Sequence, residues 1–338
     1  MSSRADAYAV LLPAIDDLTL TDPLARFLSE GGRAFLIGET RAEYVARAMS
    51  PERRAAETAD DLRALTGAIN ALAGPALIAL DQEPSGICRL HGLVPQLPGT
   101  EALQAMSSDE IEAVARAMGA AARDLGVTMF LSPVIDVVSG SNPWLQGRTL
   151  GRDPAEVARI GAAYIRGVEA AGVVTTAKHF PGHRDIDGDP AVEIATVRGD
   201  ADALAPGLTP FRAAIAAGTR AIMTGPALVP GMDAAMPSSL SAPTVRALRD
   251  LGFAGLVVSD DIDAQGTLRD QRDVPTAAVE ALVAGSDLLL LSGANDLALV
   301  RDRILSAVDQ GILPAARLAE AAARVRTLAD STGARDAD

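Results

Sequence analysis

The segment VVTTAKHFPGH, residues 173–183, runs from a mostly apolar stretch into a lysine, two histidines and a Pro-Gly turn. A short apolar run of this kind is typical of a parallel strand that is covered on both faces. The residues before it favour a helix, because Asp153-Pro154 supplies an N-cap and a first helical position and Gly172 supplies a stop. The segment therefore predicts a helix followed by a buried strand with polar side chains at its end.

Seven other apolar runs alternate with helical segments along the chain. Eight alternations in about 300 residues predict an α/β fold, a single (β/α)8 TIM-type barrel. A doubly wound sheet is the alternative, but it would need a glycine-rich turn where residues 13–16 read Pro-Ala-Ile-Asp. We expect one domain over residues 1–338, with a frayed tail at 331–338. The expected strands are Ala9–Ala14, Ala34–Gly38, Ala76–Leu80, Thr128–Pro133, Val173–Ala177, Ala221–Thr224, Leu256–Ser259 and Leu288–Leu291.

Between these runs the apolar residues recur with helical spacing. The C-terminal part, Asn295–Leu328, is expected to form two helices that are broken at Gly311–Pro314. The other expected helices are Pro51–Leu72, Ser108–Leu125, Leu208–Ala217, Ala242–Leu251 and Val274–Gly285.

The composition excludes several classes of partner. A formal net charge of −14 and a pI near 4.7 argue against binding to nucleic acid or to an anionic membrane surface. Cys88 is the only cysteine, so no disulfide can form within the chain. The apolar run Tyr8–Ile15 is short and ends in Asp16-Asp17, which is not a secretory pattern. We expect a cytoplasmic protein that does not span a membrane, and its oligomeric state is left open.

Polar side chains follow several of the predicted strands. Because catalytic residues of barrels lie at the carboxyl ends of the strands, we expect these side chains to share one site. Many hydrogen-bonding groups and few apolar walls suit a sugar, and no dinucleotide or phosphate-loop motif predicts a cofactor. The candidates are Asp81, Arg148, Lys178, His179, His183 and Ser259-Asp260-Asp261.

Asp260 and Asp261 are neighbours in the sequence, and successive residues of a strand point to opposite sides. If the strand continued through them, one carboxyl would face the site and the other the loop or the next helix. Asp261 is then expected to cap that helix. Ionised carboxylates opposite cationic groups suit a nucleophile.

The sequence gives less support to two other functions for residues 178–183, a metal site and a lyase or aldolase. The Pro-Gly turn separates His179 from His183, and no cysteine or third histidine is nearby, so no metal site is predicted. A lyase or aldolase that uses Lys178 would need a lysine with a lowered pKa in an apolar pocket. Lys178 is instead expected to face carboxylates, which raise the pKa of a lysine.

Four segments in order resemble glycoside hydrolase family 3: IALDQE, SPVIDV…NPWLQGRTLGRDP, AKHFPGH and VVSDDI. They are most similar to its single-domain bacterial β-N-acetylglucosaminidase (β-hexosaminidase) branch. The later segments PFRAAIAAGTRAIMTG, AGSDLLLLSG and QGILPAARLAEAAARV extend the similarity over roughly residues 30 to 328. Each motif alone is weakly specific, whereas the ordered set is strongly specific.

The resemblance implies a retaining glycosidase that acts on a β-linked N-acetylhexosamine or a related sugar, without a cofactor. In this family an aspartate attacks the anomeric carbon and forms a covalent glycosyl-enzyme. Asp260 matches that nucleophile. The matches to the sugar-binding positions are Asp81, Arg89, Arg148, Lys178 and His179.

The loop after AKHFPGH departs from the family pattern. The family has Asp-Ser-His there, in which the histidine is the general acid/base and the aspartate orients it. This chain has Asp189-Pro190-Ala191, so the histidine is missing. Pro84-Ser85-Gly86 also replaces Gly-Gly-Arg, and Pro226 replaces a usual histidine. These differences imply a changed substrate or leaving-group side.

Losing a general acid lowers a rate by about 10²–10⁴-fold without abolishing nucleophilic attack. A carboxylate of the same loop could replace it, namely Asp185, Asp187, Asp189 or Glu193. Asp189 is the first candidate, as acid/base or orienting group, and Asp187 and Glu193 are weaker ones. The alternatives are glycosyl transfer to another acceptor such as phosphate, or a degenerate sugar-binding paralogue. Asp260 favours an enzyme, because binding alone does not require it.

Overall fold

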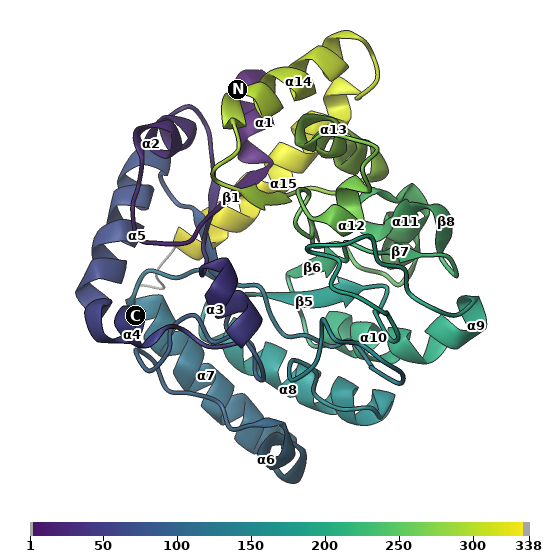
Figure 1. Ribbon diagram of the computed structural model, residues 1–338. Helices are drawn as coiled ribbons and strands as arrows, with labels where there is room; N and C mark the ends of the chain where they lie inside the picture. The colour runs from purple at the N-terminus through teal and green to yellow at the C-terminus, as the bar shows by residue number, and fades with distance from the viewer. Residues whose placement is uncertain (1–2, 334–338) are drawn as a thin grey trace.

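The computed structural model describes residues 3–333 and contains eight parallel strands arranged as a barrel (Figure 1). Neighbouring strands follow the order β10-β1-β2-β3-β4-β5-β6-β9, and a parallel bridge between Val258 and Leu288 closes the ring. The expected (β/α)8 barrel is therefore confirmed. The barrel strands are β1 (Leu11–Ile15), β2 (Ala34–Ile37), β3 (Leu77–Leu80), β4 (Met129–Phe130), β5 (Val174–Phe180), β6 (Ala221–Thr224), β9 (Leu256–Ser259) and β10 (Leu289–Ser292).

Alternate residues of the strands build two separate hydrophobic clusters. Leu36 and Ala79 belong to a cluster inside the barrel, whereas Phe35 and Ile78 belong to a larger one between strands and helices. This double burial explains why the strands are apolar throughout rather than alternating. The C-terminal helix adds Val325 to the inner cluster, so it closes the end of the barrel at which the strands begin.

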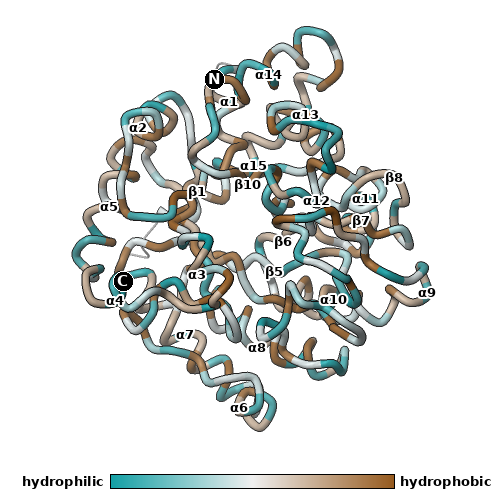
Figure 2. Tube along the Cα trace, in the orientation of Figure 1, coloured by the Kyte–Doolittle hydropathy of each residue, from teal (hydrophilic) through white to brown (hydrophobic). Residues whose placement is uncertain are grey.

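Helices surround the barrel, and Figure 2 shows both hydrophobic and hydrophilic residues along them, as amphipathic helices require. No helix within residues 3–333 is long and apolar enough to cross a bilayer. The helices are α1 (Ser3–Ala9), α2 (Asp22–Ser29), α3 (Arg41–Ala46), α4 (Pro51–Ala56), α5 (Ala59–Ala73), α6 (Thr100–Ala105), α7 (Ser108–Asp124), α8 (Pro154–Ala170), α9 (Ala201–Leu204), α10 (Leu208–Ala216), α11 (Ala242–Asp250), α12 (Gln265–Leu268), α13 (Val274–Ala284), α14 (Leu297–Asp309) and α15 (Ala315–Gly333).

Several sequence-based boundaries were wrong. The fourth strand is Met129–Phe130 rather than Thr128–Pro133, and the fifth runs to Phe180 rather than to Ala177. Pro51–Leu72 is not one helix, because Thr58 and Asp61 form a capping box that starts α5 after a break. The first strand begins at Leu11, since Ala9 ends α1. The tail is helical through Gly333 rather than frayed from Ser331, and residues 334–338 lie outside the described part.

The sequence did not predict the short helices in the loops or the hairpin of β7 (Leu228–Val229) and β8 (Asp233–Pro237). Of these, α3 follows β2 and α12 follows β9, so both lie at the carboxyl ends of the strands. They bring side chains to the end of the barrel that α15 leaves open.

Candidate active site

A cavity of about 670 Å³ lies at the carboxyl ends of the barrel strands. The loops after all eight barrel strands contribute to its lining. Six of the predicted site residues share it, namely Asp81, Arg148, Lys178, His179, Asp260 and Asp261. Residues far apart in the sequence are thus brought together as the barrel rule predicts.

A network of buried charges forms one wall of the cavity. Lys178 Nζ lies 2.5 Å from Asp81 Oδ1 and 3.2 Å from Glu83 Oε1. Arg148 holds Glu83 with two bonds, of 2.6 Å and 3.1 Å. Burial raises the pKa of Glu83, but Arg148 and Lys178 outweigh it and bring that pKa to about 2.

Lys178 is a fixed cation in this network. Burial lowers its pKa, but Asp81 and Glu83 raise it by more, so the pKa lies above its ordinary value. The structure thus confirms the expectation that Lys178 faces carboxylates, which raise its pKa. A Schiff-base lysine needs the opposite shift, and the site therefore does not support an aldolase.

His179 is held by a buried carboxylate beneath the cavity. Asp136 Oδ2 accepts from the His179 backbone N–H at 2.9 Å and lies 2.8 Å from its ring Nδ1. Because that oxygen can only accept, we assign the ring proton to Nδ1. Burial lowers the pKa of His179 more than Asp136 and Asp260 raise it. The neutral ring therefore presents Nε2 as an acceptor for a ligand hydroxyl.

Asp260 combines a fixed backbone with a free carboxylate oxygen. Its N–H donates to Thr224 O and to Ser239 Oγ, each at 3.0 Å, and Oδ1 accepts from Asp261 N at 2.7 Å. Oδ2 has no hydrogen-bond partner among the described residues and lies 3.7 Å from His179 Nε2. A positioned oxygen of this kind can attack an electrophilic carbon.

Sequence comparison identifies the family of this fold and site. Residues 44–328 match the glycosyl hydrolase family 3 N terminal domain. The chain belongs to that family. Beta-hexosaminidase LpqI of Mycobacterium tuberculosis is 31% identical over 266 residues, which cover 75% of this chain and 68% of LpqI. A beta-hexosaminidase of Stenotrophomonas maltophilia is 34% identical over 238 residues, covering 67% of this chain and 70% of that protein.

Solved structures of family 3 proteins are similar as well. A β-N-acetylglucosaminidase from Paenibacillus sp. has a TM-score of 0.88 at 27% identity. It matches 100% of this chain, which spans only 64% of the Paenibacillus chain. A family member from Mycobacterium smegmatis has a TM-score of 0.81 at 28% identity and matches 97% of both chains.

Arg89, another match to a family 3 sugar-binding position, is placed differently. Its side chain is 0% exposed and is not among the described residues that line the cavity. Its terminal nitrogens bind Glu57 at 2.6 Å and 3.1 Å, and Nε donates to Gly38 O at 2.6 Å. Arg89 thus supports the backbone at the end of β2, and direct sugar binding by it stays a prediction.

The loop in which the family 3 histidine was expected contributes little to the cavity. Within residues 184–193 of the described chain, Ala191 alone lines it. Asp189 binds Arg41 at 3.1 Å and accepts from Ala191 N at 3.0 Å. Asp187 pairs with Arg198 on the surface, and Glu193 Oε1 accepts from Asp189 N at 3.0 Å. None of these three carboxylates lines the cavity.

Asp261, by contrast, lines the cavity beside Asp260. The expectation that only one of the pair faces the site was wrong, because β9 ends at Ser259 and strand alternation ends with it. Asp261 is not a helix cap either, since the N-cap position of α12 is Ala264.

Sequence reasoning missed three side chains that follow β2. Glu39, Arg41 and Tyr44 all line the cavity. Burial and Asp81 raise the pKa of Glu39 to about 8. Tyr44 Oη accepts from Trp144 Nε1 at 2.9 Å and from Arg148 at 3.1 Å. The strand-end rule applied to β2 would have found Glu39, but the helix that presents Tyr44 has too short a pattern to predict.

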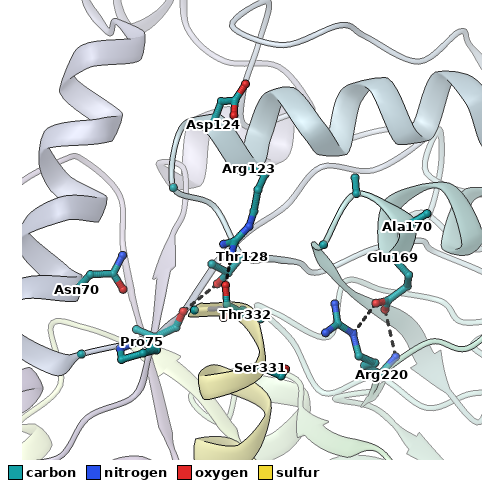
Figure 3. A pocket seen from close by; sticks show the side chains of 16 residues that line it. Asn70, Pro75, Arg123, Asp124, Thr128, Glu169, Ala170, Arg220, Ser331 and Thr332 are labelled. Atoms are coloured by element: carbon teal, nitrogen blue, oxygen red, sulfur yellow. Dashed lines mark hydrogen bonds and ion pairs between the residues drawn. The ribbon is translucent and has the colours of Figure 1, made fainter. Parts of the chain in front are cut away.

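A larger cavity of about 970 Å³ lies at the opposite end of the barrel (Figure 3). Two of its arginines already have partners, because Arg220 Nε binds Glu169 at 2.5 Å and Arg123 donates to Thr332 O. Active sites of barrels lie at the other end, so size alone does not make this cavity the candidate site.

Proposed function

We propose that this protein is a retaining glycosidase that hydrolyses a β-linked N-acetylhexosamine, or a closely related sugar, with Asp260 as the nucleophile. The observation that carries the proposal is the unpartnered Oδ2 of Asp260 in a cavity that also contains Lys178, Asp81 and His179. The beta-hexosaminidase relatives support the same substrate class.

The polar side chains that share the cavity with the nucleophile suit a pyranose. Asp81 accepts hydrogen bonds from sugar hydroxyls, and Lys178 and Arg148 donate to hydroxyl or acyl oxygens. The neutral Nε2 of His179 accepts another hydroxyl proton. Trp144 packs against the His179 ring at a centroid distance of 4.5 Å and so fixes its plane.

Hydrolysis proceeds in two displacements at the anomeric carbon. Asp260 Oδ2 forms a bond to that carbon while the glycosidic C–O bond breaks and its electron pair leaves with the aglycone oxygen. A water oxygen then attacks the same carbon, and Asp260 departs as a carboxylate. The two inversions together retain the β-configuration.

A mechanism-based label tests this proposal. The protein is incubated with 5-fluoro-N-acetylglucosaminyl fluoride, digested and analysed by peptide mass spectrometry, with Asp260→Asn as the control. We expect one label, on Asp260, and about 10³-fold or greater loss of turnover in the variant, because the nucleophile performs the chemical step. Turnover of an aryl β-N-acetylglucosaminide with no label, or with a label elsewhere, refutes the assignment.

Analysis of the reaction products distinguishes hydrolysis from glycosyl transfer to phosphate. Product analysis with and without added phosphate gives free N-acetylhexosamine in both cases if water is the acceptor. A glycosyl phosphate as the main product would contradict the hydrolase proposal.

A further inference from the structure

The proposed reaction needs a proton donor for the departing aglycone oxygen. The family position for that donor holds Ala191, which has no ionisable group, and the loop carboxylates lie outside the cavity. The donor must therefore come from another element that reaches the leaving-group side. This inference rests on the function proposed above.

Asp261 is an ionisable group that lines the cavity and follows directly on the proposed nucleophile. Its carboxyl lines the cavity immediately after the proposed nucleophile, and its backbone N–H donates to Asp260 Oδ1. Asp261 Oδ1 is buried and has no hydrogen-bond partner in the described part of the chain. A buried carboxyl oxygen without a partner is costly unless a ligand or a proton satisfies it.

The turn that carries Asp261 is fastened to the loop that carries Ala191. Gly266 N donates to Pro190 O at 2.7 Å, and Gln265 N donates to Ala191 O at 3.4 Å. The approach is close enough that a Cβ on Gly266 would lie 2.8 Å from Pro190 Cβ. Asp261 therefore lies on the same wall of the cavity as the position from which the histidine is missing.

Asp263 prepares Asp261 to hold a proton. The Asp263 carboxylate accepts from Asn295 Nδ2 at 2.6 Å and from Ser292 N at 3.1 Å, and its charge acts on the Asp261 carboxyl. The charged groups that face Asp261 are Asp260, Asp263 and Arg41. Burial, then Asp263 and Asp260, raise the pKa of Asp261 well above its usual range, and Arg41 opposes them.

We propose that Asp261 is the general acid/base of this enzyme and that Asp263 is the positioning residue with which it shares its proton. In the first displacement, the glycosidic C–O bond breaks and the Asp261 proton moves to the aglycone oxygen. In the second, the Asp261 carboxylate takes a proton from the attacking water, whose oxygen bonds to the anomeric carbon as Asp260 leaves. The proton donor is thereby restored.

Leaving-group dependence tests the assignment. Asp261→Asn is compared with the unchanged enzyme on a 2,4-dinitrophenyl and a methyl β-N-acetylglucosaminide. We expect kcat/KM to fall about 10²–10⁴-fold on the methyl glycoside, which needs acid assistance, and less than about 10-fold on the dinitrophenyl glycoside. Asp309→Asn, an exposed carboxyl of α14, is the matched control.

The pH profile gives a second readout that a purely structural role would not produce. Asp263→Asn removes the negative charge that favours the protonated form of Asp261. We therefore expect the alkaline limb of the kcat/KM profile to move to lower pH in that variant. Loss of folding, monitored by circular dichroism, would reduce activity at every pH without moving the limb.

The outcomes separate the two proposals. Retained turnover in Asp260→Asn would overturn the proposed function, and this inference with it. An inactive Asp260→Asn enzyme, combined with unchanged leaving-group dependence in Asp261→Asn, overturns the acid/base assignment alone. The acid/base assignment is also overturned if Asp189→Asn, rather than Asp261→Asn, selectively lowers kcat/KM on the methyl glycoside.

Discussion

Replacing Asp136 by asparagine tests whether this buried carboxylate organises the active-site loop. Asp136 is 0% exposed and accepts three hydrogen bonds. Two come from the backbone N–H and Nδ1 of His179, at 2.9 Å and 2.8 Å, and one from His183 N at 2.6 Å. The substitution keeps the size and shape but leaves only one acceptor oxygen.

The loss of stability follows from those contacts. If the amide oxygen keeps both His179 bonds, the amide NH₂ faces the His183 N–H, so that donor is left unsatisfied at about 1–3 kcal/mol. The two remaining bonds lose their charge assistance, which accounts for roughly 1 kcal/mol each. We therefore expect Asp136→Asn to lower the free energy of unfolding by roughly 3–5 kcal/mol.

Urea denaturation at neutral pH measures this difference, with the exposed Asp309→Asn as the matched control. The control should stay within about 0.5 kcal/mol of the unchanged protein, as surface substitutions usually do. A loss below about 1 kcal/mol in Asp136→Asn would refute the reasoning, because the three bonds would then not hold the loop. Activity should fall with stability, since His179 loses its fixed ring orientation.

Three further predictions concern other buried or capping groups. Glu83→Gln leaves the buried cations of Arg148 and Lys178 short of a carboxylate, so urea denaturation should show roughly 3–5 kcal/mol lower stability; a loss under about 1 kcal/mol contradicts this. Glu39, with its pKa raised to about 8, keeps a proton in the folded state that the unfolded chain releases above about pH 4.5. As pH rises from 4.5 to 8, the unchanged protein should therefore lose roughly 3–5 kcal/mol of stability relative to Glu39→Gln. If the difference in urea midpoint between the two proteins is the same at pH 5 and at pH 8.5, the raised pKa of Glu39 is contradicted. Asp153→Ala removes the N-cap of α8 and should lower stability by about 1 kcal/mol in thermal unfolding, whereas an unchanged Tm would show that the cap is dispensable.

The sequence by itself determined the barrel and much of the polar wall of the cavity. The eight apolar runs, the Asp153 cap and the strand-end positions of Asp81, Lys178 and Asp260 all depend on local patterns that a single sequence carries. Parallel strands must be buried on both faces, and their carboxyl ends must meet. Those two constraints place the residues without knowledge of any long-range contact.

Only the tertiary structure decided which polar groups reach the cavity from the loops. Asp189 binds Arg41, a residue 148 positions away, and is not among the described residues that line the cavity. Arg89 forms an ion pair with Glu57 and is not among the described residues that line the cavity. Asp261 faces inward because β9 ends one residue before Asp260. The direction of a loop side chain depends on where a strand ends and on partners distant in sequence. The local spacing of apolar residues predicts neither.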